Sequence, residues 1–155
     1  MVLQLPIYMD NLGTIFVSIF CGPVFGVPCA LLSSLINASF DPFALPFIPN
    51  GITAALCAGL LRLPFIEKRP IFLKTLVISL PTAVVSASIS AYLFGGITSA
   101  SSTYIVQFLY GAMHWPLFLS AFVVQVATDY LDKFIILCIA YAIIKRIPIN
   151  IKEKI

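Results

Sequence analysis

The stretch Thr75–Thr128, TLVISLPTAVVSASISAYLFGGITSASSTYIVQFLYGAMHWPLFLSAFVVQVAT, runs for 54 residues without an Asp, Glu, Lys or Arg. About 20 apolar residues in a helix cross the hydrocarbon core of a bilayer, so this stretch is long enough for two crossings. Uncharged runs of 30 and 20 residues precede it, at 11–40 and 42–61. Of all 155 residues 61% are hydrophobic and 10% are charged, against roughly 45–50% and roughly 25% in a soluble domain. The composition therefore predicts an integral membrane protein.

The sequence lacks the common signatures of catalysis and of nucleic-acid binding. It contains no GxxxxGK(S/T) phosphate-binding loop, no HExxH zinc motif and no GxSxG nucleophile motif. The segments between the apolar runs are too short for a separate catalytic domain. Neither an enzyme nor a cofactor is therefore expected, and a net charge of only +3 argues against a nucleic-acid partner.

The four cysteines lie in apolar runs, without the CxxC or neighbouring His that a metal site needs. They are predicted to be packing residues: Cys21, Cys29, Cys57 and Cys138.

Eight of the nine basic residues fall into two groups, which predicts the orientation of the chain. One group lies between two apolar runs and the other follows the last run: Arg62, Lys68, Arg69 and Lys74, then Lys145, Arg146, Lys152 and Lys154. By the positive-inside rule both groups are cytoplasmic. The chain is therefore expected to be a multi-pass protein of the plasma membrane with a cytoplasmic C-terminus.

The apolar runs divide into five expected membrane-spanning helices. The run at 11–40 is interrupted by Gly22-Pro23, and it is interpreted as two short helices because this pair ends a helix and favours a bend. The small polar residues at 95–102 predict an external turn. The expected helices are Met9–Cys21, Val24–Ala38, Phe43–Leu61, about Lys74–Phe94, and a long segment ending near Ile144. The predicted fold is all-α, an integral membrane bundle of about five transmembrane helices in one domain, 1–155, with an external N-terminus.

One expected helix carries small residues at four-residue spacing: Ser79, Ala83, Ala87, Ala91 and Gly95. A stripe of this kind lets another helix backbone approach closely. Ala54/Ala58 and Ala55/Gly59 repeat the spacing. Two interpretations stay open, packing within the chain and docking to a partner membrane subunit.

Polar residues inside a membrane are costly, so their depth carries information. From Asp129 to Arg146 the last helix rises about 25 Å, at about 1.5 Å per residue, which predicts that Asp129 lies in the outer part of the membrane. Asp132 and Lys133 lie about one turn deeper on the same side. The other strongly polar residues outside the basic groups also map to the outer half. The expected substrate-binding residues are Asp10, Asn11, Asn37, Asn50, Tyr104, His114, Trp115, Asp129, Asp132 and Lys133. A polar basin on one side only is typical of a binding cup and not of a channel.

The three charges of the last helix have a structural and a functional interpretation. Asp129 and Lys133 are spaced for an i,i+4 ion pair, which leaves Asp132 as a second carboxylate that can hold a ligand donor or a water. Two carboxylates with amides and aromatic rings favour a cationic or amine-bearing, partly aromatic ligand.

Two other pairs of residues also keep two interpretations. His114-Trp115 suits an anchor at the membrane interface as well as stacking on a ligand. Asp10-Asn11 suits the cap of a helix as well as a ligand contact.

The order and spacing of several segments resemble the substrate-binding S components of energy-coupling factor vitamin transporters. The segments are Tyr8-Met9-Asp10-Asn11-Leu12-Gly13-Thr14, Cys21-Gly22-Pro23-Val24-Phe25-Gly26, the Gly-Gly-Ile-Thr-Ser loop at 95–99, Asp129-Tyr130-Leu131-Asp132-Lys133 and Ala140-Tyr141-Ala142-Ile143-Ile144-Lys145. The resemblance implies a small six-helix membrane subunit that binds a vitamin or related nutrient from outside. It also implies a transmembrane coupling subunit and two ATPase subunits as partners, besides membrane lipid.

The chain departs from this family at its N-terminus. The family has a further helix before the position of Leu5-Pro6-Ile7, and that helix carries an Ala-rich motif that docks on the coupling subunit. This sequence begins too late to contain it, so the stripe Ser79–Gly95 is the candidate substitute for the docking surface.

Two classes of function follow from these observations. The first is a substrate-binding membrane subunit of an ATP-driven vitamin or nutrient importer, which captures its ligand in an outward-facing cavity without chemistry on it. The second is a membrane-embedded sensor or assembly subunit with no transported ligand, in which the polar basin serves only structural pairing. An enzyme ranks third, because Asp129, Asp132 and His114 form an acid/base set without an activated nucleophile or a metal site.

Overall fold

The computed structural model describes residues 11–96 and 103–146, and this part of the chain is helical without a strand. Its elements are α1 (Leu12–Cys21), α2 (Pro23–Ala38), a 3-10 helix η2 (Pro42–Phe47), α3 (Ile48–Leu60), α4 (Pro64–Glu67), α5 (Ile71–Phe94), α6 (Thr103–Met113) and α7 (Leu117–Arg146). The predicted all-α class is confirmed. Asp10 and the basic residues Lys152 and Lys154 lie outside the described residues.

The bend predicted at Gly22-Pro23 is present between α1 and α2. Gly22 has a φ of 97°, a left-handed value that glycine adopts without the penalty of a Cβ. Pro23 then opens α2 as its first residue, where its missing N–H costs nothing. The third predicted helix is shorter than expected, because α3 begins at Ile48 after the 3-10 helix.

The prediction of one long segment after the 95–102 turn is wrong, because α6 and α7 are separate helices. The break falls at His114-Trp115-Pro116. His114 has a positive φ of 53°, which is not a helical value. Trp115 is also disfavoured in the helical conformation, because it directly precedes Pro116. The short helices α4 and α6 were not expected from the sequence, so the described chain has seven α-helices rather than five.

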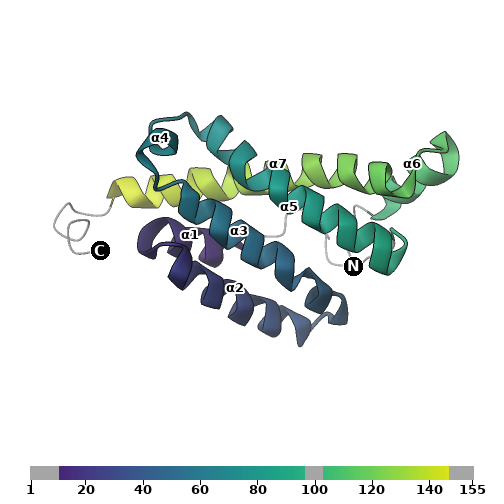
Figure 1. Ribbon diagram of the computed structural model, residues 1–155, viewed down its shortest axis with the longest axis horizontal. Coiled ribbons are helices and arrows are strands. Elements are labelled where there is room, and N and C mark those ends of the chain that lie inside the picture. The colour runs from purple at the N-terminus through teal and green to yellow at the C-terminus, as the bar shows by residue number, and fades with distance from the viewer. Residues whose placement is uncertain (1–10, 97–102, 147–155) are drawn as a thin grey trace.

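The long helices α5 and α7 pack against each other, and α1, α2 and α3 lie together on one side of this pair (Figure 1). The helices α1, α2, α3, α5 and α7 alternate in direction. At one end of the bundle lie the α1–α2 turn, α4 and the C-terminal end of α7 (Figure 1). This basic end carries the exposed Arg62, Lys68 and Arg69. At the far end, the rings of Phe47 and Phe94 stack at 6.0 Å.

The core is built from small and medium-sized residues, which allows the helices to pack closely. Its largest cluster joins α1, α3, α5 and α7 through Ile15, Ala54, Cys57, Ala58, Leu61, Ile78, Ile136 and Leu137. The stripe residues Ser79, Ala83 and Ala87 are fully buried, on a helix whose main packing partner is α7. Packing within the chain therefore accounts for these three residues, whereas Ala91 is only partly buried and Gly95 is exposed.

Within the described residues, α5 is the helix that is both long and apolar enough to cross a membrane. The helices α1 and α2 are apolar but shorter, at 10 and 16 residues, and so is the segment Ala44–Leu60. The helix α7 has 30 residues, but any stretch of it as long as a membrane span includes Asp129, Asp132 and Lys133. Its central charges therefore distinguish it from α5.

Candidate binding site

Three charged side chains are buried at the middle of α7. Asp132 and Lys133 are 3% and 2% exposed, and the side chain of Asp129 is 13% exposed. Asp129 lies 12 residues after Leu117, or about 18 Å along the helix at about 1.5 Å per residue. The sequence prediction measured the depth of Asp129 only from Arg146, whereas α7 also extends to the N-terminal side of Asp129, as far as Leu117. The cluster therefore lies near the centre of the helix and not at its margin.

Lys133 lies between the two carboxylates and contacts both of them. Its Nζ is 3.5 Å from Asp129 Oδ1 and 3.4 Å from Asp132 Oδ2, to which it donates a hydrogen bond. The expected i,i+4 pair of Asp129 and Lys133 is therefore present, but the expectation that Asp132 is left over is wrong. Asp129 Oδ2, however, is buried without a hydrogen-bond partner among the described residues. A buried acceptor without a hydrogen-bond partner carries a desolvation cost, which a bound hydrogen-bond donor would remove.

The cluster packs against the first half of α5. The Phe72 ring lies 5.8 Å from the Tyr130 ring, and Lys74 Nζ donates a hydrogen bond of 3.0 Å to Tyr141 Oη. Asp132 and Lys133 lie between these two contacts along α7. The facing part of α5 buries hydroxyl groups, and the Ser79 Oγ has no hydrogen-bond partner within the described part of the chain.

Sequence reasoning missed these hydroxyl groups because it treated α5 as a stripe of small residues. Five Ser and Thr side chains recur every three or four residues along α5 and all are buried: Thr75, Ser79, Thr82, Ser86 and Ser90. This spacing is the helical period and was visible in the sequence. A polar stripe on one face of an otherwise apolar helix predicts that this face is turned to the interior of the protein.

Lys74 was assigned to the basic loop, but it lies inside α5 and is 5% exposed. Its ammonium group lies 4.3 Å from the centroid of the Tyr141 ring, in addition to the hydrogen bond to that tyrosine. The contact joins α5 and α7 at the basic end. The aliphatic stem of a lysine allows this arrangement, because it can cross an apolar surface while the charge reaches a polar partner.

Replacing Lys74 by Met is expected to lower the free energy of unfolding by about 1–3 kcal/mol, since both the cation–π contact and the hydrogen bond are lost. Tyr141→Phe keeps the ring and removes only the hydrogen bond, so its effect should be smaller. Thermal unfolding of both variants in the same detergent checks the predicted order of the two effects on stability. Equal melting temperatures for Lys74→Met and the unmodified protein would contradict the role of this contact.

The asparagines of the predicted site are dispersed. Asn11 lies just before α1, and α1 contacts α7. Asn50 lies in the first turn of α3, with its Oδ1 buried and without a hydrogen-bond partner in the described segments. Asn37 lies near the end of α2, whose main contacts are with α1, α3 and η2. Asp10 lies outside the described residues.

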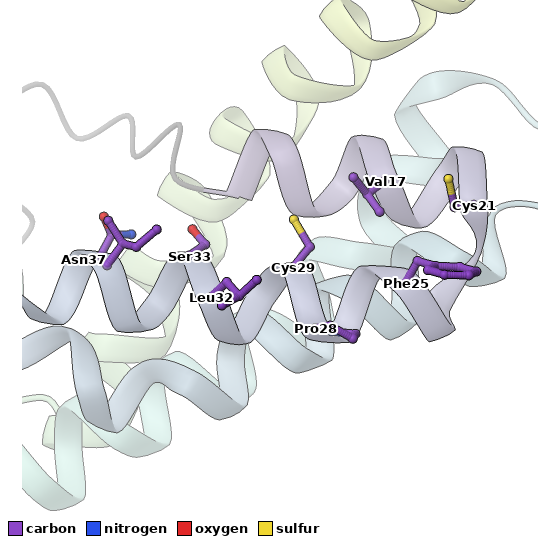
Figure 2. Close-up of a pocket in the computed structure, with 9 residues that line it drawn as sticks. Val17, Cys21, Phe25, Pro28, Cys29, Leu32, Ser33 and Asn37 are labelled. Atoms are coloured by element: carbon purple, nitrogen blue, oxygen red, sulfur yellow. The ribbon is translucent and has the colours of Figure 1, made fainter.

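Asn37 lines an open groove of about 550 Å³ between α1 and α2 (Figure 2). Apart from Asn37 and Ser33, the groove is lined by Val17, Cys21, Phe25, Pro28, Cys29, Leu32 and Ile36. Asn37 lies at the opposite end of the labelled set from Cys21 and Phe25 (Figure 2). The groove is thus mainly apolar. Contrary to the expectation, the structure places Asn37 in this groove and not at the charged cluster.

The aromatic residues of the predicted site are also separate from the cluster. Tyr104 is 80% exposed on α6, and His114 and Trp115 are exposed at the α6–α7 junction. The length of α7 between Leu117 and Asp129 places this junction about 18 Å along the helix from the carboxylates. Of the predicted cup residues that the structure describes, Asp129, Asp132 and Lys133 lie together, and Asn11 precedes a helix that contacts α7.

The cysteines carry no metal site in the described chain, where no group of three potential ligands occurs. All four are free thiols. Cys57 is buried in the core as predicted, but Cys21 is exposed, so packing does not account for every cysteine.

Comparison with known proteins adds no further assignment. No family model matches the chain, and no curated protein or solved structure is significantly similar to it.

Proposed function

We propose that the chain is a membrane-embedded subunit that captures a small cationic solute for an ATP-driven importer. The membrane location is supported by the distribution of side chains. Large hydrophobic residues are exposed on every long helix, among them Phe25, Leu32, Leu80, Val84 and Leu131. The interior contains small and medium-sized apolar residues together with buried hydroxyl groups and charged side chains. A surface of this kind suits a hydrocarbon solvent, whereas a soluble monomer rarely exposes large contiguous apolar patches.

The orientation follows from the basic end of the bundle. Arg62, Lys68 and Arg69 are exposed at the same end as the C-terminal part of α7. Under the positive-inside rule this end faces the cytoplasm. The far end, with the Phe47–Phe94 stack, then faces outward.

The charged cluster of α7 is the single observation that carries the proposed binding function. Ionised side chains in a membrane segment are expensive and by default indicate a functional site. Two carboxylates and one ammonium leave this cluster with a formal charge of −1, and the buried Asp129 Oδ2 is available as an acceptor. A cation or protonated amine complements this charge, so it is the ligand class that we assign.

The role in an importer rests on the resemblance to S components and on the absence of an ATP-binding motif from the sequence. Energy must then come from separate ATPase subunits, acting through a transmembrane coupling subunit. The chain itself performs no chemistry on the ligand in this proposal.

Asp129→Asn is expected to weaken binding of the cation about tenfold to a hundredfold, because a charged hydrogen bond of about 1.5–3 kcal/mol is lost. Asp132→Asn also makes the cluster neutral, so it should weaken binding of the cation as well, since each carboxylate contacts Lys133 through one oxygen. Mass spectrometry of the small molecules that co-purify with the protein from native membranes measures the loss, whatever the identity of the ligand.

The matched control is Glu67→Gln, which removes an exposed carboxylate from α4. It should leave the co-purified molecule unchanged. Full occupancy in Asp129→Asn, or a ligand that is absent from the unmodified protein as well, would contradict the proposed site.

The isolated chain, reconstituted in liposomes, is expected to bind the co-purified molecule without accumulating it. Concentration against a gradient requires an energy source that the sequence does not contain. Uptake of the labelled molecule measures this directly. Accumulation inside the liposomes without added ATPase subunits would refute the importer subunit.

A further inference from the structure

The short helix α6 exposes an apolar face that nothing in the described chain covers. Only Val106 of this helix is buried, in a cluster with Ala87, Ala121 and Val124 from α5 and α7. Leu109 is partly buried against this cluster. Five other large side chains point outward, with exposed fractions from 50% to 80%: Tyr104, Ile105, Phe108, Tyr110 and Met113.

The exposed face continues onto the ends of the two long helices. Tyr92 at the end of α5 is 80% exposed, and its ring lies 6.2 Å from that of Phe118 at the start of α7. Trp115 lies at the α6–α7 junction, three residues before Phe118 in the sequence, and is 37% exposed. We call these three residues, together with the five of α6, the α6 face. No Asp, Glu, Lys or Arg occurs between residues 75 and 128, so the face carries no formal charge.

The residue types favour lipid over protein as the occupant. Tyr92, Tyr104, Tyr110 and Trp115 combine an apolar ring with a polar tip, and such residues are enriched where hydrocarbon meets the headgroups. A protein interface is expected to have a polar rim around its apolar centre, whereas the described neighbours of this face within 75–128 are uncharged.

The dimensions of the helices agree with a position at the boundary. From Lys74 to Tyr92, α5 rises about 27 Å at about 1.5 Å per residue, close to a hydrocarbon thickness of about 30 Å. When Lys74 lies near one boundary, Tyr92 lies near the other. With eleven residues, α6 rises only about 16 Å and is too short to cross the core.

We infer that α6 is an interfacial helix that holds the far end of the bundle in the headgroup boundary of the bilayer. The phenylalanine and isoleucine side chains of the α6 face enter the acyl chains, and the tyrosine and tryptophan tips reach the polar layer. This inference rests on the proposed membrane location, but it adds a lipid-binding surface and a depth for α6.

Trp115 provides the test, because it is the only tryptophan of the chain. The full-length protein is reconstituted in phosphatidylcholine vesicles whose acyl chains carry bromine near either the glycerol end or the methyl end. We expect strong quenching of Trp115 by bromine near the glycerol end, weaker quenching by bromine near the methyl end, and little quenching by aqueous iodide.

A second tryptophan separates this inference from the proposed membrane location. Leu80 is 45% exposed on α5, so Leu80→Trp in a Trp115→Phe background should be quenched most by bromine near the methyl end. Suppose that Leu80→Trp behaves in this way while Trp115 is quenched by iodide and not by lipid bromine. The inferred interfacial position of α6 is then wrong, and the proposed membrane location stands. Shielding of Trp115 from both quenchers would indicate a protein cover and would also overturn the inference. If lipid bromine quenches neither tryptophan, both proposals fail.

Discussion

Lys133→Met is expected to destabilise the protein by about 3–5 kcal/mol, because removing one member of a buried ion pair leaves an uncompensated buried charge. Lys133 Nζ contacts Asp129 Oδ1 at 3.5 Å and Asp132 Oδ2 at 3.4 Å. Methionine keeps much of the volume and the unbranched shape of lysine, so the loss reports mainly the charge. Thermal unfolding in one detergent, at one pH, measures it.

The matched rescue is the triple variant Lys133→Met, Asp129→Asn, Asp132→Asn. It removes all three charges at once, so no uncompensated charge is left buried in the protein. We expect it to melt near the unmodified protein while it no longer binds the cation. If Lys133→Met alone melts like the unmodified protein, the cluster is hydrated and is not the buried network described above.

Gly59→Ala is expected to lower stability by about 1–3 kcal/mol through overpacking, although alanine in place of glycine normally favours a helix. A Cβ at this position of α3 would lie 2.7 Å from two atoms of the Pro23 ring. That ring cannot rotate away, because it is closed onto the backbone at the first turn of α2. The two helices would have to separate. The measurement is again the melting temperature, with the helix content recorded by circular dichroism.

The control for this change is Gly13→Ala in α1, where a Cβ would meet nothing within 4 Å. Its expected effect is neutral or stabilising by up to about 1 kcal/mol. Gly26→Ala should lower stability, as Gly59→Ala does, because its Cβ would overlap the Ser18 side chain. If Gly59→Ala and Gly13→Ala have the same effect on the melting temperature, close packing of α2 and α3 is not a constraint on the fold.

Local signals in the sequence were sufficient to predict the class of fold and several helix boundaries. The long uncharged runs predicted helices, and the Gly22-Pro23 pair predicted the α1–α2 turn, since its backbone preferences act within a few residues. The small residues at 54, 55, 58 and 59 indicated close helix packing, and all four are buried in α3. The break before α7 was missed, although Pro116 marks a disfavoured helical position just before it.

The candidate site was only partly predictable. The positions of Asp129, Asp132 and Lys133 on one side of a helix follow from the helical period and were foreseen. Their place near the middle of α7 was not foreseen, because the start of this helix at Leu117 was unknown, and their depth in a membrane stays a prediction. Asn37 and His114 were assigned to the site by the same depth measurement. In the structure, Asn37 lies in the α1–α2 groove and His114 at the α6–α7 junction.

By itself, the sequence determined the all-helical fold and the first turn, because the length of the apolar runs and the preferences of glycine and proline can be read from neighbouring residues. Only the tertiary structure decided that Lys133 lies between both carboxylates, that Lys74 leaves the basic loop to contact Tyr141, and that the hydroxyl face of α5 turns inward. These features depend on how α5 and α7 cross. That crossing results from contacts between residues tens of positions apart, which no local pattern encodes.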